Sequence, residues 1–344
     1  MFKQIEQYGH EGVYFGYDEE SGLKAIIAVH STVLGPALGG TRMWDYVSED
    51  EAIYDVLRLS KGMSLKSSAA GLDLGGGKAV IIGDPKIKTE KLLRAYGRFV
   101  ESLNGKYITA EDVNIGVEDA EIMAQTTKHV VGLHGKSGDP SPFTARGVYR
   151  GMKAGALEKF GVESLKGLTV AVQGLGKVGY ELCRLVKEDG GIIVASEINK
   201  AKTDFAAEKL GIKIVSPEEI LYQNCDILAP CALGAVINSD NAKKLNCKLI
   251  AGGANNVLVD NNAGDILVDR DILYIPDYIV NAGGVINVFF ETKGTYDVEE
   301  ATRKVDAIYE NVQGVLKFAK EEKLPTHLAA DKFAMKRIEE AAKC

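Results

Sequence analysis

Two lysines are the residues of this chain best suited to chemistry, because both lie in surroundings that do not favour a charge. Lys66 comes after Gly62, Met63 and Leu65, and Lys78 follows three glycines and opens the apolar run 79–82. Lysine is almost never fully buried without a partner, so two lysines that converge on one cavity need an anion. Repulsion and loss of water favour the uncharged amine, which can act as a base near neutral pH.

A plainer interpretation of the same stretch is a solvated Lys66 on a helix and a Lys78 that reaches solvent from the start of a strand. A phosphate-binding loop is excluded. The motif G-x-x-x-x-G-K-[ST] needs glycine at 72 and serine or threonine at 79, where the chain has Leu72 and Ala79.

A second candidate site follows the predicted strand 168–173, where a glycine motif leads into a predicted helix over 180–188. The motif G-x-G-x-x-G predicts a dinucleotide site in which the pyrophosphate lies at the helix N-terminus. The next predicted strand, 191–196, ends in Glu197, whose carboxylate could bind the adenosine ribose and would repel a 2′-phosphate. This pattern favours NAD over NADP. The motif residues are Gly174, Leu175, Gly176, Lys177, Val178 and Gly179.

Carboxylates and amides follow other predicted strands. Glu111 and Asp112 come directly after the strand 107–110, where ligands of α/β proteins gather. The stretches 252–256 and 281–287 are predicted as amide-rich loops near the nicotinamide, although ordinary turns have the same composition. The stretch 34–42 is likewise predicted as a glycine-rich loop.

Strands and helices alternate along the chain, which predicts an α/β fold of two domains. Hairpin strands are expected over 12–31, a capped helix over 48–63 that leads to Lys66, and long helices over 299–323 and 328–342. Three glycines and two prolines in 132–142 indicate a crossing between domains. The predicted division is a substrate and oligomerisation domain, 1–140 plus about 325–344, and a Rossmann domain, 141–324, with a cleft between them.

Composition narrows the class of protein. A net charge of -7 and a pI near 5.5 argue against a nucleic-acid partner. The five cysteines are scattered and the five histidines form no i,i+4 pair, so neither disulfides nor a metal site is expected. With no signal peptide or apolar span, the sequence is typical of a cytoplasmic protein that acts on a small molecule.

Several motifs together resemble the amino-acid dehydrogenases of the glutamate, leucine, phenylalanine and valine type, and their leucine branch most closely. The resemblance covers nearly the whole chain. It rests on G-P-A-L-G-G-T-R-M-W (35–44), the two lysines around A-A-G-L-D-L-G-G-G-K, Y-I-T-A-E-D (107–112), Q-G-L-G (173–176), A-P-C-A-L-G (229–234) and N-A-G-G-V-I-N-V (281–288).

The resemblance implies a role for each matching residue. Lys66 would bind the substrate carboxylate, Lys78 would activate water, and Asp112 would move protons to and from the amino group. The resemblance also implies a reversible, NAD-dependent oxidative deamination. It implies a homo-oligomer as well, with eight subunits as the favoured number. Further substrate contacts would be Gly39, Gly40 and Met63, and Thr144 and Asn256 match positions that hold the nicotinamide. Asn281, at the start of the amide-rich stretch 281–287, is a further candidate contact of the cofactor.

The side-chain pocket implied by the resemblance is uncharged, with Leu38 and Val288 at positions where the glutamate branch has a lysine and a serine. Ala110 and Val285 would complete it, so leucine, valine and isoleucine are the expected substrates. Phe289 and Phe290 stand where smaller or acidic residues are expected, which keeps phenylalanine open. A nucleotide- or amino-acid-sensing protein without turnover is the alternative from another class, although a sensor needs no base.

Overall fold

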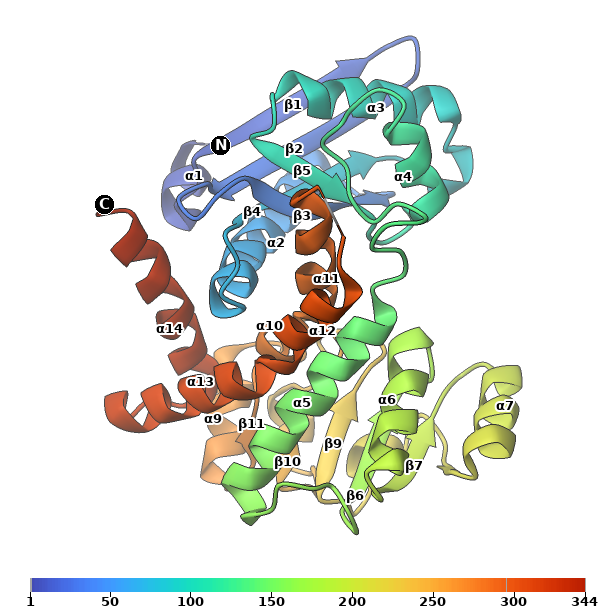
Figure 1. Cartoon of the computed structure of the whole chain (residues 1–344), viewed down its shortest axis with the longest axis vertical. Helices are drawn as coiled ribbons and strands as arrows, with labels where there is room; N and C mark the ends of the chain where they lie inside the picture. The colour runs from blue at the N-terminus through green and yellow to red at the C-terminus, as the bar shows by residue number, and fades with distance from the viewer. Residues whose placement is uncertain (1, 295, 344) are drawn as a thin grey trace. The chain divides into compact units, whose positions relative to one another are not determined.

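The computed structural model describes residues 2–294 and 296–343, which form two compact units (Figure 1). The first unit comprises Met1–Asp139, Val288–Val298 and Ala334–Cys344, and the second Pro140–Asn287 and Glu299–Phe333. Residues 325–333, expected in the first domain, thus group with the second unit, and Val288–Val298 with the first. Within the described residues, no helix has the length and apolarity needed to cross a membrane.

The first unit is built on a five-stranded mixed sheet with the order β1-β2-β4-β3-β5. Strands β1 and β2 form the predicted hairpin and β2 continues antiparallel to β4, whereas β3 is parallel to both β4 and β5. The elements are α1 (Phe2–Tyr8), β1 (Gly12–Asp18), β2 (Leu23–Ser31), β3 (Ala37–Trp44), α2 (Glu49–Ala69), β4 (Gly75–Ile82), η1 (Pro85–Ile87), α3 (Glu90–Ser102), β5 (Tyr107–Ala110) and α4 (Val117–Met123).

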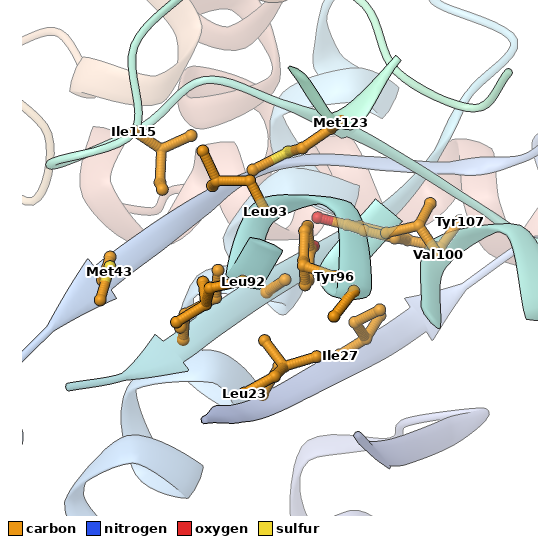
Figure 2. Packing of buried hydrophobic residues seen from close by; sticks show 14 of the residues in the cluster. Leu23, Ile27, Met43, Leu92, Leu93, Tyr96, Val100, Tyr107, Ile115 and Met123 are labelled. Atoms are coloured by element: carbon orange, nitrogen blue, oxygen red, sulfur yellow. The ribbon is translucent and has the colours of Figure 1, made fainter. Parts of the chain in front are cut away.

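Helices cover both faces of this sheet. The predicted start of α2 is confirmed, since the Ser48 side chain accepts a hydrogen bond from the Glu51 N–H and caps the helix. Helix α2 packs on one face, and α3 and α4 pack on the other. Figure 2 shows the core on the second face, where residues of α3 such as Leu93 and Tyr96 meet strand residues such as Ile27. Each large apolar side chain buried there stabilises the unit by about 1.5–3 kcal/mol.

Two local predictions in this unit are wrong for the same reason. The stretch 34–42 is not a loop throughout, because Ala37–Trp44 form β3, and β4 starts at Gly75 rather than after the glycines. The glycines lie inside strands at places where chain segments approach closely. A Cβ atom on Gly39 would be 1.8 Å from the Gly77 carbonyl oxygen, and one on Gly76 would be 2.1 Å from the backbone nitrogen of Ser64 in α2.

The second unit has the predicted Rossmann sheet, a parallel six-stranded sheet with the order β11-β10-β9-β6-β7-β8. The strand order reverses between β6 and β9, and ligands of such sheets bind at that point. The elements are α5 (Ser141–Phe160), β6 (Thr169–Gln173), α6 (Lys177–Glu188), β7 (Ile192–Ser196), α7 (Lys200–Leu210), β8 (Lys213–Ile214), η2 (Ile220–Tyr222), β9 (Ile227–Pro230), α8 (Ser239–Ala242), β10 (Leu249–Ile250), α9 (Asn261–Asp269) and β11 (Leu273–Tyr274).

The C-terminal third departs from prediction in two places. The expected loop 281–287 is helical from Gly283 onward, and the expected helix 299–323 is divided at Ala307. Glycine composition suggested a loop, but a Cβ atom on Gly283 would lie 1.9 Å from the Phe143 carbonyl oxygen, so this glycine permits close packing against α5. The elements are α10 (Asp277–Val280), α11 (Gly283–Thr292), α12 (Val298–Asp306), α13 (Ile308–Glu322) and α14 (Thr326–Ala341).

Candidate active site

Lys78 and Asp112 form an ion pair across an intervening strand of the first unit. Lys78 is on β4, Asp112 follows β5 by two residues, and β3 lies between these strands. The Lys78 Nζ atom is 3.0 Å from Asp112 Oδ1. Strands two places apart in a sheet are separated by about 10 Å. The lysine side chain covers much of that distance, so the sheet brings together two residues that are far apart in sequence.

Gly40 lies where this ion pair passes over β3. Leu38 pairs with Gly76 and Thr41 with Ala79, so Gly40 is level with Lys78, and on its other side Gly40 pairs with Ala110. A Cβ atom on Gly40 would be 2.3 Å from the Glu111 carbonyl oxygen and 2.9 Å from Asp112 Cβ. A side chain at position 40 would therefore occupy space that Asp112 needs.

The electrostatics of the pair follow from its burial. The Lys78 side chain is 7% exposed and that of Asp112 is 25% exposed. Burial alone raises the pKa of Asp112, but the positive charges of Lys78 and Arg42 outweigh it and hold the pKa at about 2. Asp112 is therefore a carboxylate at neutral pH, and it supplies an anion that the buried Lys78 requires.

Other residues predicted to contact substrate lie on the same sheet and on α2. Gly39 is next to Gly40, and its carbonyl accepts a hydrogen bond from the Tyr107 hydroxyl at 2.5 Å. Met63 and Lys66 are half-buried in the C-terminal part of α2. The Ser67 hydroxyl donates to the Gly75 carbonyl at 3.4 Å, which places the last turn of α2 against the beginning of β4. The convergence of Lys66 and Lys78 on one ligand stays a prediction.

The residues predicted to line the side-chain pocket are all buried and apolar. Leu38, Ala110 and Val288 belong to the first unit, with exposures of 2%, 8% and 7%. Val285 belongs to the second unit and is equally buried. Phe289 and Phe290, which depart from the pattern expected of the family, are both buried and pack edge to face at a ring distance of 5.4 Å.

In the second unit, the three glycines of the motif have three different surroundings. Gly174 has a φ of +93°, which favours glycine at the turn. A Cβ atom on Gly176 would meet nothing within 4 Å, so the backbone is open to a ligand there, whereas one on Gly179 would be 2.0 Å from the Gly174 carbonyl oxygen. Gly176 also leaves the N-terminus of α6 without a side-chain cap, so its N–H groups can receive a pyrophosphate.

Glu197 follows β7 and is fixed by backbone groups. Its carboxylate accepts hydrogen bonds from the Leu175 N–H at 2.9 Å and from the Asn199 N–H at 3.1 Å. Burial raises the pKa of Glu197, but these hydrogen bonds and Lys202 lower it below its usual value. Glu197 is thus an anion beside the glycine turn, with lone pairs left for ribose hydroxyls. Lys177 and Val178 begin α6.

The two amide-rich stretches are connected to each other. The buried Asn281 donates from Nδ2 to Asn255 Oδ1 at 2.9 Å, which ties the turn after Val280 to the loop 252–256. Asn256 is exposed with a φ of 52°, a conformation that asparagine tolerates. Thr144, half-buried in the first turn of α5, donates from its hydroxyl to the Pro140 carbonyl at 3.1 Å.

Two buried oxygen atoms in this unit lack a hydrogen-bond partner within the described part of the chain. They are Asn281 Oδ1 and Gln173 Oε1, and Gln173 ends β6 directly before the glycine turn. A buried acceptor without a donor is costly. The donor set, the open backbone at Gly176 and these two acceptors are compatible with a bound dinucleotide, which carries both phosphates and hydrogen-bond donors.

Two family models match this chain, one over the first unit and one mainly over the second. Residues 12–129 match the model of the Glu/Leu/Phe/Val dehydrogenase dimerisation domain, and residues 196–344 match that of glutamate/leucine/phenylalanine/valine dehydrogenase. This chain belongs to the glutamate/leucine/phenylalanine/valine dehydrogenase family. It is an amino-acid dehydrogenase, and the predicted two-domain α/β fold with a Rossmann sheet is confirmed.

Relatives within the dehydrogenase family carry different names. The chain is 53% identical to leucine dehydrogenase of Bacillus subtilis (strain 168), over 98% of this chain and 94% of that protein. It is 45% identical to phenylalanine dehydrogenase of Thermoactinomyces intermedius, over 98% and 94% of the two chains. The crystal structure of L-tryptophan dehydrogenase from Nostoc punctiforme is similar, with a TM-score of 0.89 at 43% identity and full coverage of both chains.

Sequence reasoning missed several residues of this dehydrogenase that touch the predicted ones. Arg42 lies in the motif 35–44, whose sequence alone indicates no role for it, although its side chain contacts Asp112. Had 37–44 been predicted as a strand, the alternation of side chains would have placed Arg42 on the same face as Leu38 and Gly40. No sequence pattern indicates a role for Tyr107 or Gln173. Their importance depends on which atoms surround their polar groups in the folded structure.

Proposed function

We propose that this amino-acid dehydrogenase catalyses the reversible, NAD-dependent oxidative deamination of branched-chain L-amino acids, with leucine preferred over valine and isoleucine. An L-amino acid, water and NAD⁺ give a 2-oxo acid, ammonium, NADH and a proton. The observation that carries the proposal is the Lys78–Asp112 pair at 3.0 Å, in a unit whose predicted pocket residues are uncharged.

The two side chains of the pair have complementary tasks. NAD would supply the acceptor for the hydride that leaves the substrate Cα. The amine of Lys78, when uncharged, takes a proton from the water that adds to the oxidised carbon. Asp112, a carboxylate at neutral pH, accepts and returns protons at the amino nitrogen as ammonia leaves. Lys66 pairs with the substrate carboxylate, which fixes the position of Cα.

The substrate preference rests on the apolar lining. Leu38 and Val288 offer no partner to a charged side chain, so a substrate carboxylate placed against them would lose its hydration without compensation. Discrimination among aliphatic side chains is expected to be modest, since one methylene is worth about 1–3 kcal/mol. The closeness of named leucine dehydrogenases, at 53% identity, supports the same choice.

A substrate panel tests this proposal. NADH formation from NAD is followed at alkaline pH with leucine, valine, isoleucine, phenylalanine, tryptophan and glutamate, and kcat/KM is compared. The branched-chain substrates should rank first. Phenylalanine or tryptophan ranking first would refute the substrate assignment and keep the reaction, whereas NADH binding without any turnover would favour a sensor.

Lys78→Ala tests the catalytic assignment. Turnover should be abolished, because no other group is assigned to activate water, while NADH binding measured by fluorescence should stay within about twofold. Lys91→Ala is the matched control, since Lys91 also pairs with a carboxylate in the first unit but is 53% exposed. Residual turnover of Lys78→Ala near the wild-type rate would contradict the mechanism.

We also infer a homo-oligomer, with the octamer as the expected form. Phe15 and Tyr17 on the edge strand β1 are 58% and 71% exposed, and an exposed apolar edge is a common site of strand pairing between subunits. The family description of residues 12–129 as a dimerisation domain supports an oligomer formed through the unit that contains β1. Light scattering coupled to gel filtration measures the subunit count directly, and a monomer would refute the inference.

A further inference from the structure

A chain of charged side chains continues from Asp112 on the side away from Lys78. The Arg42 Nε atom donates to Asp112 Oδ2 at 3.1 Å, and another nitrogen of the same guanidinium donates to Asp55 Oδ2 at 2.9 Å. Asp55 Oδ2 also accepts from the Tyr46 hydroxyl at 2.8 Å, and Asp55 Oδ1 accepts from Arg58 at 3.2 Å. All these residues belong to the first unit.

The geometry leaves the Asp112 carboxylate little freedom to rotate. Its Oδ1 faces Lys78 and its Oδ2 faces Arg42, so each oxygen is held by a different cation. The planar guanidinium of Arg42 is itself held by two carboxylates, and its donors are fixed relative to one another. Arg42 and Asp55 are mostly buried, with side-chain exposures of 23% and 15%, which strengthens these contacts relative to pairs in water.

We propose that Arg42 is a positioning residue for the Lys78–Asp112 pair, and that Asp55, which also accepts a hydrogen bond from Tyr46, holds Arg42 in place. Arg42 keeps one carboxylate oxygen of Asp112 occupied, so the other oxygen remains directed at Lys78. The inference rests on the catalytic roles proposed above for Lys78 and Asp112. Arg42 is not assigned a contact with substrate, and it acts through Asp112.

Other charged groups lie near Asp112. Besides Lys78 on β4 and Arg42 on β3, a surface hollow that Asp112 lines also includes Lys86, Lys88, Glu111 and Asp119. Lys88 is paired with Asp119 at 2.5 Å. Of these groups, Lys78 and Arg42 are the cations that contact the Asp112 carboxylate directly, so a change at Arg42 alters the charge next to the pair and leaves the Lys88–Asp119 pair in place.

The experiment compares Arg42→Met and Arg42→Lys with the control Arg58→Met. Both methionine variants remove one guanidinium from Asp55, but only Arg42 touches Asp112. The substrate is the amino acid that the wild type converts fastest, whichever it is. For Arg42→Met, kcat should fall about 10- to 100-fold, because a displacement of about 1 Å costs up to about 100-fold. KM should change less than about threefold.

The pH profile of kcat/KM separates positioning from general destabilisation. Arg42 is one of the two cations that lower the pKa of Asp112, so its loss should raise that pKa, and the acid limb should move to higher pH in Arg42→Met. Arg42→Lys should be intermediate in kcat, because lysine restores the charge without the fixed fork. Arg58→Met should keep the wild-type limb and a kcat within about twofold.

Each outcome bears on the proposal. Wild-type kcat and an unshifted acid limb in Arg42→Met would overturn it, and so would equal losses in Arg42→Met and Arg58→Met. If the wild type converts no amino acid, the proposed function fails separately. A crystal structure of Arg42→Met then decides the positioning role, which requires that the 3.0 Å contact between Lys78 and Asp112 be lost. An unchanged contact would refute it.

Discussion

Gly40→Ala is expected to disable catalysis through the addition of one methyl group. The new Cβ atom would lie 2.3 Å from the Glu111 carbonyl oxygen, whereas ordinary contacts begin at 3.4 Å. The segment that carries Asp112 must therefore move by about 1.1 Å, or β3 must move by a similar amount. The opposing atoms are the Glu111 carbonyl and Asp112 Cβ, which cannot rotate out of the way as the end of a long side chain can.

The expected size of the effect follows from that displacement. A misplacement of about 1 Å costs up to about 100-fold in rate, which corresponds to about 2.7 kcal/mol of transition-state stabilisation. Crowding a packed interior also costs about 1–3 kcal/mol of folding free energy. The effect should appear in kcat, and KM for NAD should change little, because Gly40 lies in the first unit and the glycine motif in the second.

The assay is steady-state kinetics of Gly40→Ala beside Gly314→Ala, with thermal unfolding of both. Gly314 lies in α13, where an added Cβ would be 3.4 Å from the Phe333 ring, so this control should keep wild-type kinetics. A Gly40→Ala enzyme that is folded and retains kcat within about threefold would refute the reasoning. A crystal structure in which the 3.0 Å contact between Lys78 and Asp112 persists would refute it independently.

The buried His10 and His30 should make the stability of the first unit depend on pH. Their ring nitrogens contact the hydroxyls of Ser60 and Ser64, and burial foremost lowers both pKa values to about 4. Because the unfolded chain takes up these protons near pH 6.5, stability should fall from about pH 6.5 to about pH 4, by up to about 3 kcal/mol for each histidine. Urea unfolding at pH 7 and pH 5 measures this loss of unfolding free energy. The prediction would be contradicted if the free energy changed equally between the two pH values in the wild type and in a His10→Gln, His30→Asn double variant. Glu197→Gln, which removes the charge and keeps an acceptor for the glycine turn, should lower the NAD to NADP ratio of kcat/KM about tenfold, whereas Glu197→Asp should preserve it; an unchanged ratio in Glu197→Gln would exclude the ribose assignment.

The Rossmann half could be predicted from sequence because its signals are local. The motif at Gly174 and the acid at Glu197 lie in consecutive strand-turn-helix segments, so their spacing alone brings them together. In the structure Glu197 accepts a hydrogen bond from Leu175 inside the motif. The parallel order of the strands also follows from alternation of strands and helices.

At 34–42 and 281–287, glycine composition predicts loops where the structure has a strand and a helix. A glycine in a sequence indicates either a turn or a close approach of two segments, and the residue type does not distinguish them. At Gly39 and Gly283 the reason is close approach, to the Gly77 and Phe143 carbonyls respectively. Both partners are distant in sequence or belong to another element, so only the folded structure reveals which meaning applies.

The order of the strands in the sheet of the first unit cannot be predicted from their order along the chain. Strand β5 follows β4 in sequence but pairs with β3, which therefore separates Lys78 from Asp112. Strands that are neighbours in sequence are often neighbours in a sheet. If β4 and β5 were paired in this way, Lys78 and Asp112 would lie on adjacent strands with no strand between them. Given the real order, Gly40 lies beside the segment that carries Asp112, and an added Cβ atom there would meet the Glu111 carbonyl oxygen and Asp112 Cβ, so this position must lack a side chain. The same order places Arg42 two residues further along β3, on the face where Asp112 lies. Residue type therefore identifies the groups that could do chemistry, while strand order identifies the residues that give them space and hold them.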